Sequence, residues 1–226
     1  MKKIKNEAEL LNIFCDKSYY SNPLRSAPFL NAKYNEVWST DGYVFIGINP
    51  KILTKEYPKG ELLLPELEFP CEKTITTEAL NKAFDSCPMV DEEIVIEDAV
   101  ECKECNGSGT VYLDYTDKSG NIHECSMCCP LCNGEGEIQP CKTKKTGKKI
   151  IAEDTVVEVG NAHFFANRLQ VLKVAMEYLN VKTVKMTHNA PKGASEFIIS
   201  NDIRVLIMPM LFDYSCTCSA KLELVD

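Results

Sequence analysis

The chain lacks any apolar run long enough to cross a bilayer. Its longest hydrophobic stretch is 205–212, whereas a membrane-spanning helix needs about 20 such residues. The first residues are basic, but no apolar run follows them, so the sequence predicts no export signal. Together these absences favour a cytoplasmic protein that has no membrane partner.

Catalytic motifs are missing as well. The sequence contains no phosphate-binding glycine loop, no dinucleotide fingerprint after a strand, no H-E-x-x-H and no nucleophile elbow. Histidine is scarce, with only His123, His163 and His188, and His163 adjoins two phenylalanines and is interpreted as structural. We therefore expect a protein that is not an enzyme and that acts by binding.

Positive charge is in the minority, since 25 Lys and Arg face 33 Asp and Glu, a net charge of −8. Uniform coating of nucleic acid is therefore disfavoured, although a local basic face is not. Arginine is rare, 3 residues against 22 lysines, which hints at an AT-rich bacterial or phage genome. The 226 residues, 45% of them hydrophobic, suffice to bury a sizeable core in one large or two small domains.

Cysteine is unusually abundant, with 12 in the chain, 7 of them from Cys102 to Cys141. Without an export signal, metal binding is favoured over a disulfide framework. An acidic run, 91–101, precedes the cysteine-rich segment, and a lysine-rich run follows it. These shifts predict an inserted module at 101–141 within a discontinuous domain formed by 1–100 and 142–226. The scattered cysteines, interpreted as ordinary packing or tail, are Cys15, Cys71, Cys87, Cys216 and Cys218.

Two octets in the module, 102–109 and 129–136, share the pattern C-x-x-C-x-G-x-G. Two thiolates three positions apart can occupy two corners of a zinc tetrahedron, and the glycines let the backbone turn sharply behind the sulfurs. Between the octets, 110–116 and 121–125 flank a turn and predict a β-hairpin that folds one octet onto the other. The competing interpretation is a redox-active cysteine pair. The predicted zinc ligands are Cys102, Cys105, Cys129 and Cys132.

Another C-x-x-C pair, Cys125 and Cys128, stands immediately before the second octet. With His123 and Cys141 it forms a second candidate metal site of tetrahedral type. Spare thiols or an alternative ligand register are the competing interpretations.

The octet segment resembles the cysteine-rich domain of DnaJ-type co-chaperones. That family repeats the octet four times and forms two zinc sites, so two octets imply one site here. The resemblance covers only 102–138 and includes no J-domain, and it does not by itself carry chaperone function to this chain. A co-chaperone-like factor that binds proteins through its zinc module is the alternative function.

The remaining sequence predicts an α+β fold, because single helices alternate with antiparallel strands. The clearest helix covers 167–179 with Asn167 as its N-cap, and shorter helices cover 77–84, capped by Thr76 or Thr77, and 7–14. The predicted strands are 36–40, 43–48, 182–187, 196–200 and 203–208. Asp41-Gly42 is a strong hairpin signal between the first two strands.

Three segments resemble the bacterial DNA polymerase III sliding clamp. The stretch 29–45, with Thr40-Asp41-Gly42, is similar to a clamp segment that reads T-D-G-H-R-L. The stretch 196–211, with Met208-Pro209-Met210, is similar to the C-terminal strand that ends M-P-M-R-L, and 159–169 is similar to the strand-to-helix entry of the final clamp domain. The resemblance implies a clamp-like domain of two half-units, each a helix with antiparallel strands. A weak echo between 75–83 and 164–172 agrees with this.

In that family, two such segments line a shallow apolar pocket that captures short linear peptides from polymerases and clamp loaders. Tyr43-Val44 replaces the family's His-Arg, and Leu211-Phe212 replaces Arg-Leu. A buried C-terminal strand beside an ordinary Asp-Gly hairpin is the competing interpretation. The peptide-binding residues that the resemblance implies are Thr40, Gly42, Val44, Met208, Pro209 and Met210.

Partners follow from the same resemblance. Clamp rings contain six such domains, and this chain has room for one, so a ring needs six copies; a clamp-derived monomer or dimer is the alternative.

A concentrated positive patch offers contact with phosphates, with a solvated loop as the competing interpretation. We expect a replication or repair accessory that binds replication-type proteins, linear peptides or DNA. The lysines of the patch are Lys142, Lys144, Lys145, Lys148 and Lys149.

Overall fold

The structure is a computed structural model, which describes residues 4–17, 22–64, 66–96, 99–138, 142–211 and 218–225. It divides into two compact units: a first unit, Met1–Met89 with Ile151–Asp226, and a second unit, Val90–Ile150. No helix in the described ranges is both long and apolar enough to span a membrane.

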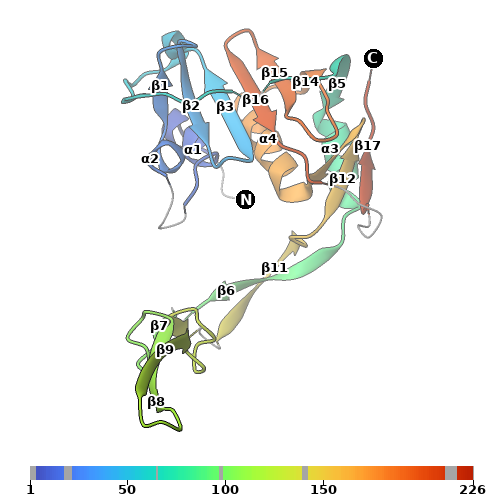
Figure 1. Ribbon diagram of the computed structural model, residues 1–226. Helices are drawn as coiled ribbons and strands as arrows, with labels where there is room; N and C mark the ends of the chain where they lie inside the picture. The colour runs from blue at the N-terminus through green and yellow to red at the C-terminus, as the bar shows by residue number, and fades with distance from the viewer. Residues whose placement is uncertain are drawn as a thin grey trace. The chain divides into compact units, whose positions relative to one another are not determined.

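The first unit is built on an 8-stranded sheet in the order β4-β1-β2-β3-β16-β15-β14-β5 (Figure 1). Its pairs are antiparallel except β1 with β4. The strands are β1 (Phe29–Asn31), β2 (Glu36–Thr40), β3 (Val44–Ile48), β4 (Lys59–Gly60), β5 (Pro70–Thr76), β14 (Thr183–His188), β15 (Ser195–Ser200) and β16 (Ile203–Ile207). A 3-stranded sheet joins β13 (Ala162–Phe165), β12 (Val156–Val159) and β17 (Ala220–Leu222).

The middle of the large sheet is buried on both faces. All five residues of β3 are buried, and its apolar side chains alternate between two separate hydrophobic clusters, one on each face of the sheet. Val44, Ile46 and Ile48 join the larger core, whereas Phe45 packs with Trp38 on the opposite face. Such double burial explains why this strand is a nearly continuous apolar run.

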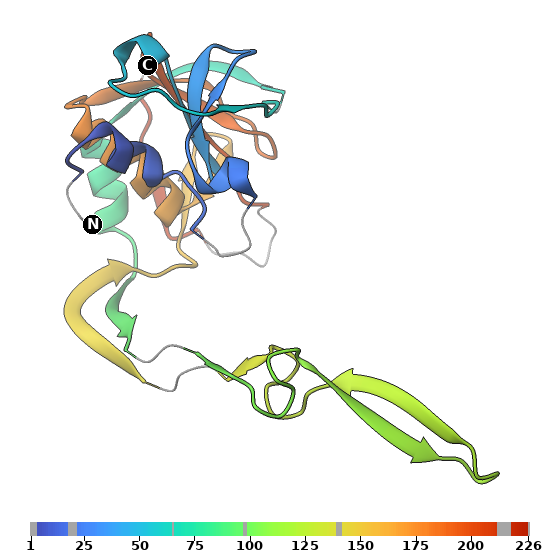
Figure 2. The ribbon, with the colours of Figure 1, turned by 90° about the vertical axis from the view of Figure 1, so that its left-hand side faces the viewer.

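Helices cover one face of the sheet. They are α1 (Glu7–Asn12), α3 (Thr77–Asp85) and α4 (Ala166–Tyr178), and they lie together beside the strands (Figure 2). Leu11, Leu80 and Leu169 come from the three helices, are fully buried and belong to the larger core. The two shortest helical segments are α2 (Pro23–Ser26) and η1 (Pro50–Ile52).

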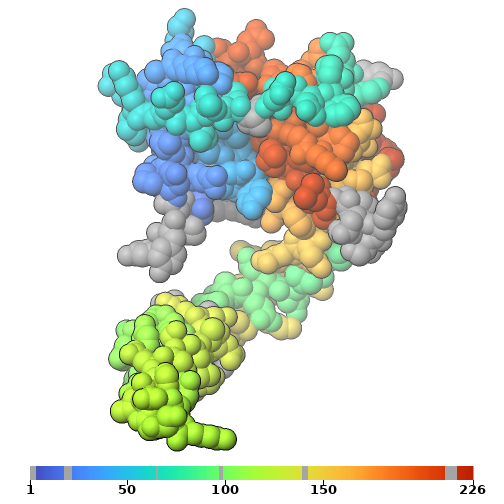
Figure 3. Space-filling model, viewed as in Figure 1, coloured from blue at the N-terminus to red at the C-terminus, as the bar shows by residue number. Residues whose placement is uncertain are grey.

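The opposite face is covered by the chain that follows β4. Leu62, Leu64 and Leu67 pack against a smaller core around Trp38, whose indole N–H donates to Glu36 Oε2 at 2.8 Å. Figure 3 shows this segment, in teal, crossing the blue and orange strands. The segment is a cover without regular structure, which the strand and helix patterns in the sequence did not indicate.

The α+β class is confirmed, and the three predicted helices are present with ends that differ from the prediction by at most two residues. Thr76 is the N-cap of α3, and its hydroxyl accepts from the Ala79 amide at 3.0 Å. Asn167 as the cap of the long helix is wrong, because α4 starts at Ala166 with Phe165 in the cap position and no side-chain cap. The reason is that β13 runs straight into the helix, so an extended strand residue occupies the position of the cap.

The second unit consists of paired strands and turns. A ribbon pairs β6 (Met89–Val95) with β11 (Thr143–Ile151), β7 (Val100–Glu101) pairs with β10 (Glu137–Ile138), and a hairpin pairs β8 (Thr110–Thr116) with β9 (Ile122–Cys128). In the ribbon, Lys145 Nζ donates to Asp91 Oδ2 at 2.8 Å, and Thr143 Oγ1 donates to Glu93 Oε2 at 2.7 Å. The acidic and lysine-rich runs that border the cysteines therefore lie on opposite strands of one ribbon.

Leu169→Ala is expected to lower the free energy of unfolding of the first unit by about 2–5 kcal/mol, because it leaves a cavity in the core between α4 and the sheet. Glu177→Ala on the same helix is the matched control and should cost less than about 0.5 kcal/mol, since Glu177 is exposed and only pairs with Lys173 at 3.6 Å. Urea denaturation measures both. Equal losses would contradict the assigned core.

Candidate metal centre and apolar pocket

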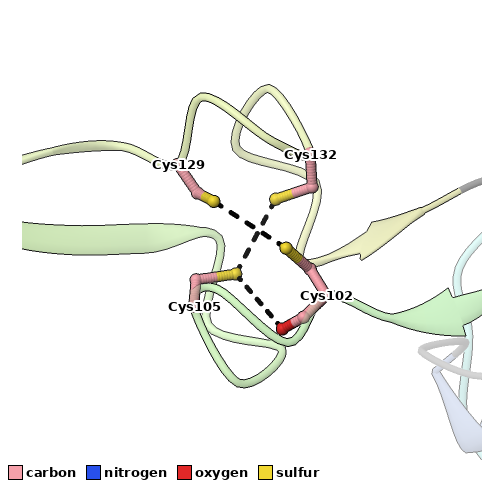
Figure 4. Close-up of side chains that lie close together, drawn as sticks. All are labelled: Cys102, Cys105, Cys129 and Cys132. Atoms are coloured by element: carbon pink, nitrogen blue, oxygen red, sulfur yellow. Dashed lines mark hydrogen bonds between the residues drawn. The ribbon is translucent and has the colours of Figure 1, made fainter.

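The four octet cysteines form one buried cluster. Their sulfurs lie within 4.8 Å of one another, and none of the four side chains is more than 7% exposed (Figure 4). Cys102 Sγ lies 3.8 Å from Cys129 Sγ, and Cys105 Sγ lies 3.7 Å from Cys132 Sγ. A tetrahedron with Zn–S bonds of about 2.3 Å has edges of about 3.8 Å. The donor set and its spacing therefore fit a tetrathiolate metal site.

The two octets are related by a local two-fold symmetry in their hydrogen bonds. The amide of Cys102 donates to Gly136 O at 2.8 Å, and the amide of Cys129 donates to Gly109 O at 2.8 Å. Each octet also aims one glycine amide at its own second sulfur, from Gly109 to Cys105 and from Gly136 to Cys132, both at 3.3 Å. Amides directed at sulfur stabilise the thiolates that a metal requires.

The electrostatics of Cys132 agree with a thiolate site. Burial raises the pKa of this thiol, but the Gly136 amide, the Cys129 thiol, the Gly134 amide and the Cys105 thiol outweigh that effect and lower the pKa to about 7. A metal ion would favour the deprotonated sulfur further.

The glycines of the octets are required by close backbone approach. Gly109 and Gly136 have backbone φ angles of 73° and 79°, a region that residues other than glycine rarely adopt. A Cβ on Gly109 would overlap the carbonyl oxygen of Gly134, and a Cβ on Gly136 would overlap that of Gly107. These glycines therefore let the two octets touch, in addition to turning the chain behind the sulfurs.

The structure does not bring together the three members of the second candidate metal set that it describes. His123 and Cys125 lie on one face of β9, and Cys128 lies on the other, because strand residues alternate. The ring of His123 stacks on Tyr115, and its Nε2 contacts Asp117 Oδ2 at 3.0 Å. Cys141 lies outside the described residues.

The lysines of the positive patch stand on or next to a strand rather than in a loop. Lys144, Lys145, Lys148 and Lys149 lie on β11 and are exposed, and Lys142 directly precedes it. Lys145 is paired with Asp91, and this carboxylate raises its pKa. Part of the local positive charge is thus offset by the neighbouring acidic strand.

The turn between β2 and β3 is fixed by its own side chains. Thr40 Oγ1 donates to Val44 O at 2.7 Å and accepts from the Gly42 amide at 2.9 Å. Asp41 Oδ1 accepts from the amides of Tyr43 at 2.7 Å and Val44 at 2.8 Å. Gly42 has a φ of 98°, so glycine is needed there. The Thr-Asp-Gly segment is therefore a preformed wall.

Beside this turn lies an apolar cavity of about 360 Å³. Thr40, Gly42, Val44 and Met208 line it, which brings together four of the six residues that the clamp resemblance implied. Pro209 and Met210 do not line this cavity; the Met210 amide donates to His163 O at 2.8 Å. The other lining residues are Arg25, Tyr43, Phe45, Leu62, Leu63, Leu64, Ala194 and Leu206.

Sequence reasoning missed the leucines of this cavity. Leu62, Leu63 and Leu64 come from the covering segment, and Leu63 is 64% exposed. The available signal was a run of three leucines without helical or strand periodicity, ahead of a proline. An exposed leucine at the rim of an apolar cavity is typical of a binding surface.

A second cavity of about 510 Å³ lies on the other side of Tyr43 and Val44, which line both cavities. Arg168 lines it, stacks 4.3 Å from the Tyr43 ring centroid, and donates to Met208 O at 2.7 Å. Burial lowers the pKa of Arg168, with Asp41 and Tyr43 opposing the shift. The two adjoining cavities therefore differ in lining: the first is largely apolar, and the second mixes charged and apolar side chains.

The chain is therefore a mixed α+β protein with four buried cysteines whose placement fits a metal ion and with an apolar cavity. No protein-family model matches it, and no curated protein matches its sequence. Among solved structures it is similar to the DNA polymerase sliding clamp from Bacillus subtilis, with 10% identity over 90% of this chain and 62% of that chain and a TM-score of 0.40.

Two further similarities are to clamps with bound molecules. The Pseudomonas aeruginosa DNA polymerase sliding clamp with ligand aligns at 8% identity over 90% of this chain and 64% of that chain, with a TM-score of 0.33. The Helicobacter pylori beta clamp bound to DNA ligase peptide aligns at 14% identity over 78% of this chain and 41% of that chain, with a TM-score of 0.28. The chain thus spans less than two thirds of each of these clamps.

Gly109→Ala is expected to weaken zinc binding by roughly tenfold or more, because the new Cβ forces the octets apart. Gly120→Ala is the matched control: Gly120 also has a positive φ, of 88°, but a Cβ there meets nothing within 4 Å. Competition with a chromogenic zinc chelator measures both affinities. If the two variants bind zinc equally well, octet contact does not build the site.

Proposed function

We propose that this chain is a non-catalytic, clamp-like accessory of DNA replication or repair. It captures short linear peptides of partner proteins in the apolar cavity and carries zinc in the four-cysteine centre as a structural ion. The observation that carries the proposal is the lining of one cavity by Thr40, Gly42, Val44 and Met208. These residues come from distant parts of the chain, and the clamp resemblance nominated them on sequence alone.

The chemistry of the cavity suits an extended peptide. Met208 supplies a flexible, polarisable thioether, and the leucine rim supplies apolar surface. The Met208 amide donates to Tyr43 O at 2.8 Å, so the two walls are joined by backbone and the cavity is preformed. A preformed site saves a peptide the free energy of ordering its receptor.

Zinc has a different part in this proposal. When bound, it would hold the two octets together as a structural cross-link, which small modules with little core require. The four cysteines are supported as ligands by their spacing and burial. The exposed lysines of β11 are proposed as a contact for DNA phosphates.

Met208→Ala is expected to weaken binding of a labelled clamp-motif peptide, the type of segment by which polymerases and clamp loaders enter the pocket of the resembled family. The loss should be roughly tenfold, because the substitution removes most of an apolar side chain from the cavity wall. Met127→Ala, an exposed methionine of the second unit, is the matched control and should bind normally. Fluorescence anisotropy measures both, and an unchanged affinity in Met208→Ala would refute the pocket.

The alternative, a co-chaperone-like protein-binding factor, is favoured by one observation on the hairpin. Leu113, Tyr115 and Met127 share one face of β8 and β9 and are 48%, 56% and 46% exposed. Apolar side chains gathered on an exposed strand face are typical of protein contacts.

The double substitution Leu113→Ser with Tyr115→Ser separates the two functions in the full chain. Under the proposed function, affinity for the clamp-motif peptide should stay within about twofold, because these side chains are not part of the cavity. Under the alternative, binding of a permanently unfolded, carboxymethylated protein should be lost. Peptide anisotropy and co-sedimentation give the two readouts. Loss of peptide capture in this variant would contradict the assignment of function to the first unit.

A further inference from the structure

Three chemically different ligand side chains that belong to none of the sites described above converge in the first unit. A carboxylate oxygen of Glu158, a ring nitrogen of His163 and the sulfur of Cys218 all lie within 4.8 Å of one another. Among the described residues, this group and the four octet cysteines are the groups of three or more metal-ligating side chains that come so close. Local sequence patterns do not indicate this group, because the three residues share no spacing motif.

Backbone pairing holds the three residues in place. Glu158 on β12 and His163 on β13 are direct cross-strand partners. Cys218 leads into β17, which pairs in parallel with the other edge of β12, and the Ser219 amide donates to Val156 O at 2.8 Å. The 3-stranded sheet therefore delivers one donor from each strand region to the same place.

The donor set selects the kind of ion. A thiolate, an imidazole and a carboxylate together suit Zn²⁺ and similar transition ions, whereas Mg²⁺ and Ca²⁺ prefer oxygen alone. In a tetrahedral site, such donors lie about 3.3–3.6 Å apart. The present atoms lie within 4.8 Å of one another, so small side-chain rotations would bring them to that spacing. Three protein ligands leave the fourth position open to water or another donor.

A lysine holds the carboxylate of this group in place. Lys221 is the cross-strand partner of Glu158 in β17, and its Nζ donates to Glu158 Oε1 at 2.6 Å. This contact orients the carboxylate, as hydrogen-bonding partners of ligand side chains do at metal sites. Lys221 offsets part of the Glu158 charge, so the Cys218 thiolate and the His163 imidazole would be the main ligands of the ion.

We propose that Glu158, His163 and Cys218 form a second zinc site, separate from the four-cysteine centre. The ion would tie the segment 218–225 to β12 and β13. The site also adjoins the chain that carries the pocket methionine, because the Met210 amide donates to His163 O at 2.8 Å. This proposal stands on its own residues and does not depend on the proposed function.

Native mass spectrometry of the full chain in zinc-buffered solution tests the site. The wild type should carry two zinc ions, and Cys218→Ser and His163→Gln should each carry one. Cys71→Ser, which alters another half-buried cysteine, is the matched control and should keep both. A wild type with a single ion that Cys105→Ser removes and Cys218→Ser leaves in place would overturn the proposal.

A second measurement guards against loss of fold in these variants. In the Cys105→Ser background, which lacks the four-cysteine centre, added zinc should still raise the Tm of the first unit. This rise should disappear in Cys105→Ser with Cys218→Ser, while the Tm in the absence of zinc stays the same. Identical zinc responses in the single and double variants would refute the site, whatever the ion count.

Discussion

The double burial of β3 is the constraint on which the first unit depends. A strand with no solvent-facing side needs a cover on each face, and the chain supplies two unlike covers. Helices with regular apolar faces cover one side, and an irregular leucine-bearing segment covers the other. The apolar cavity lies where the irregular cover passes over β3 and the adjoining turn. A cover without helical or strand hydrogen bonding leaves a gap there, and the gap is the proposed peptide pocket.

Much of the fold follows from local patterns. The Asp41-Gly42 turn, the cap at Thr76 and the hairpin between the octets depend on short-range chemistry, and each could be predicted from adjacent residues. The start of α4 could not, because a strand runs into the helix without a separating cap. The ribbon of β6 and β11 was also hidden, since its acidic and basic runs lie about 50 residues apart and look like unstructured charge until they are paired.

The candidate sites also differ in whether adjacent residues were enough to predict them. The octet cysteines lie close together because their own turns and glycines position them, so spacing in the sequence was enough. The pocket needed a resemblance for Thr40 and Met208, and even then its leucine rim came from a segment without periodicity. The group at Glu158, His163 and Cys218 depends on which strands neighbour β12, and no sequence spacing encodes that register.

The ends of the second unit have a consequence for folding. The Ala152 amide donates to Pro88 O at 3.0 Å, so the chain leaves the first unit and returns to it at adjacent points. An unstructured insertion of about 60 residues would cost the host about 2 kcal/mol more in loop-closure entropy than a short turn. The backbone contact between Pro88 and Ala152 closes this loop within the first unit, and the larger core takes no residue from the insertion, so the core of the first unit is complete without the four-cysteine centre.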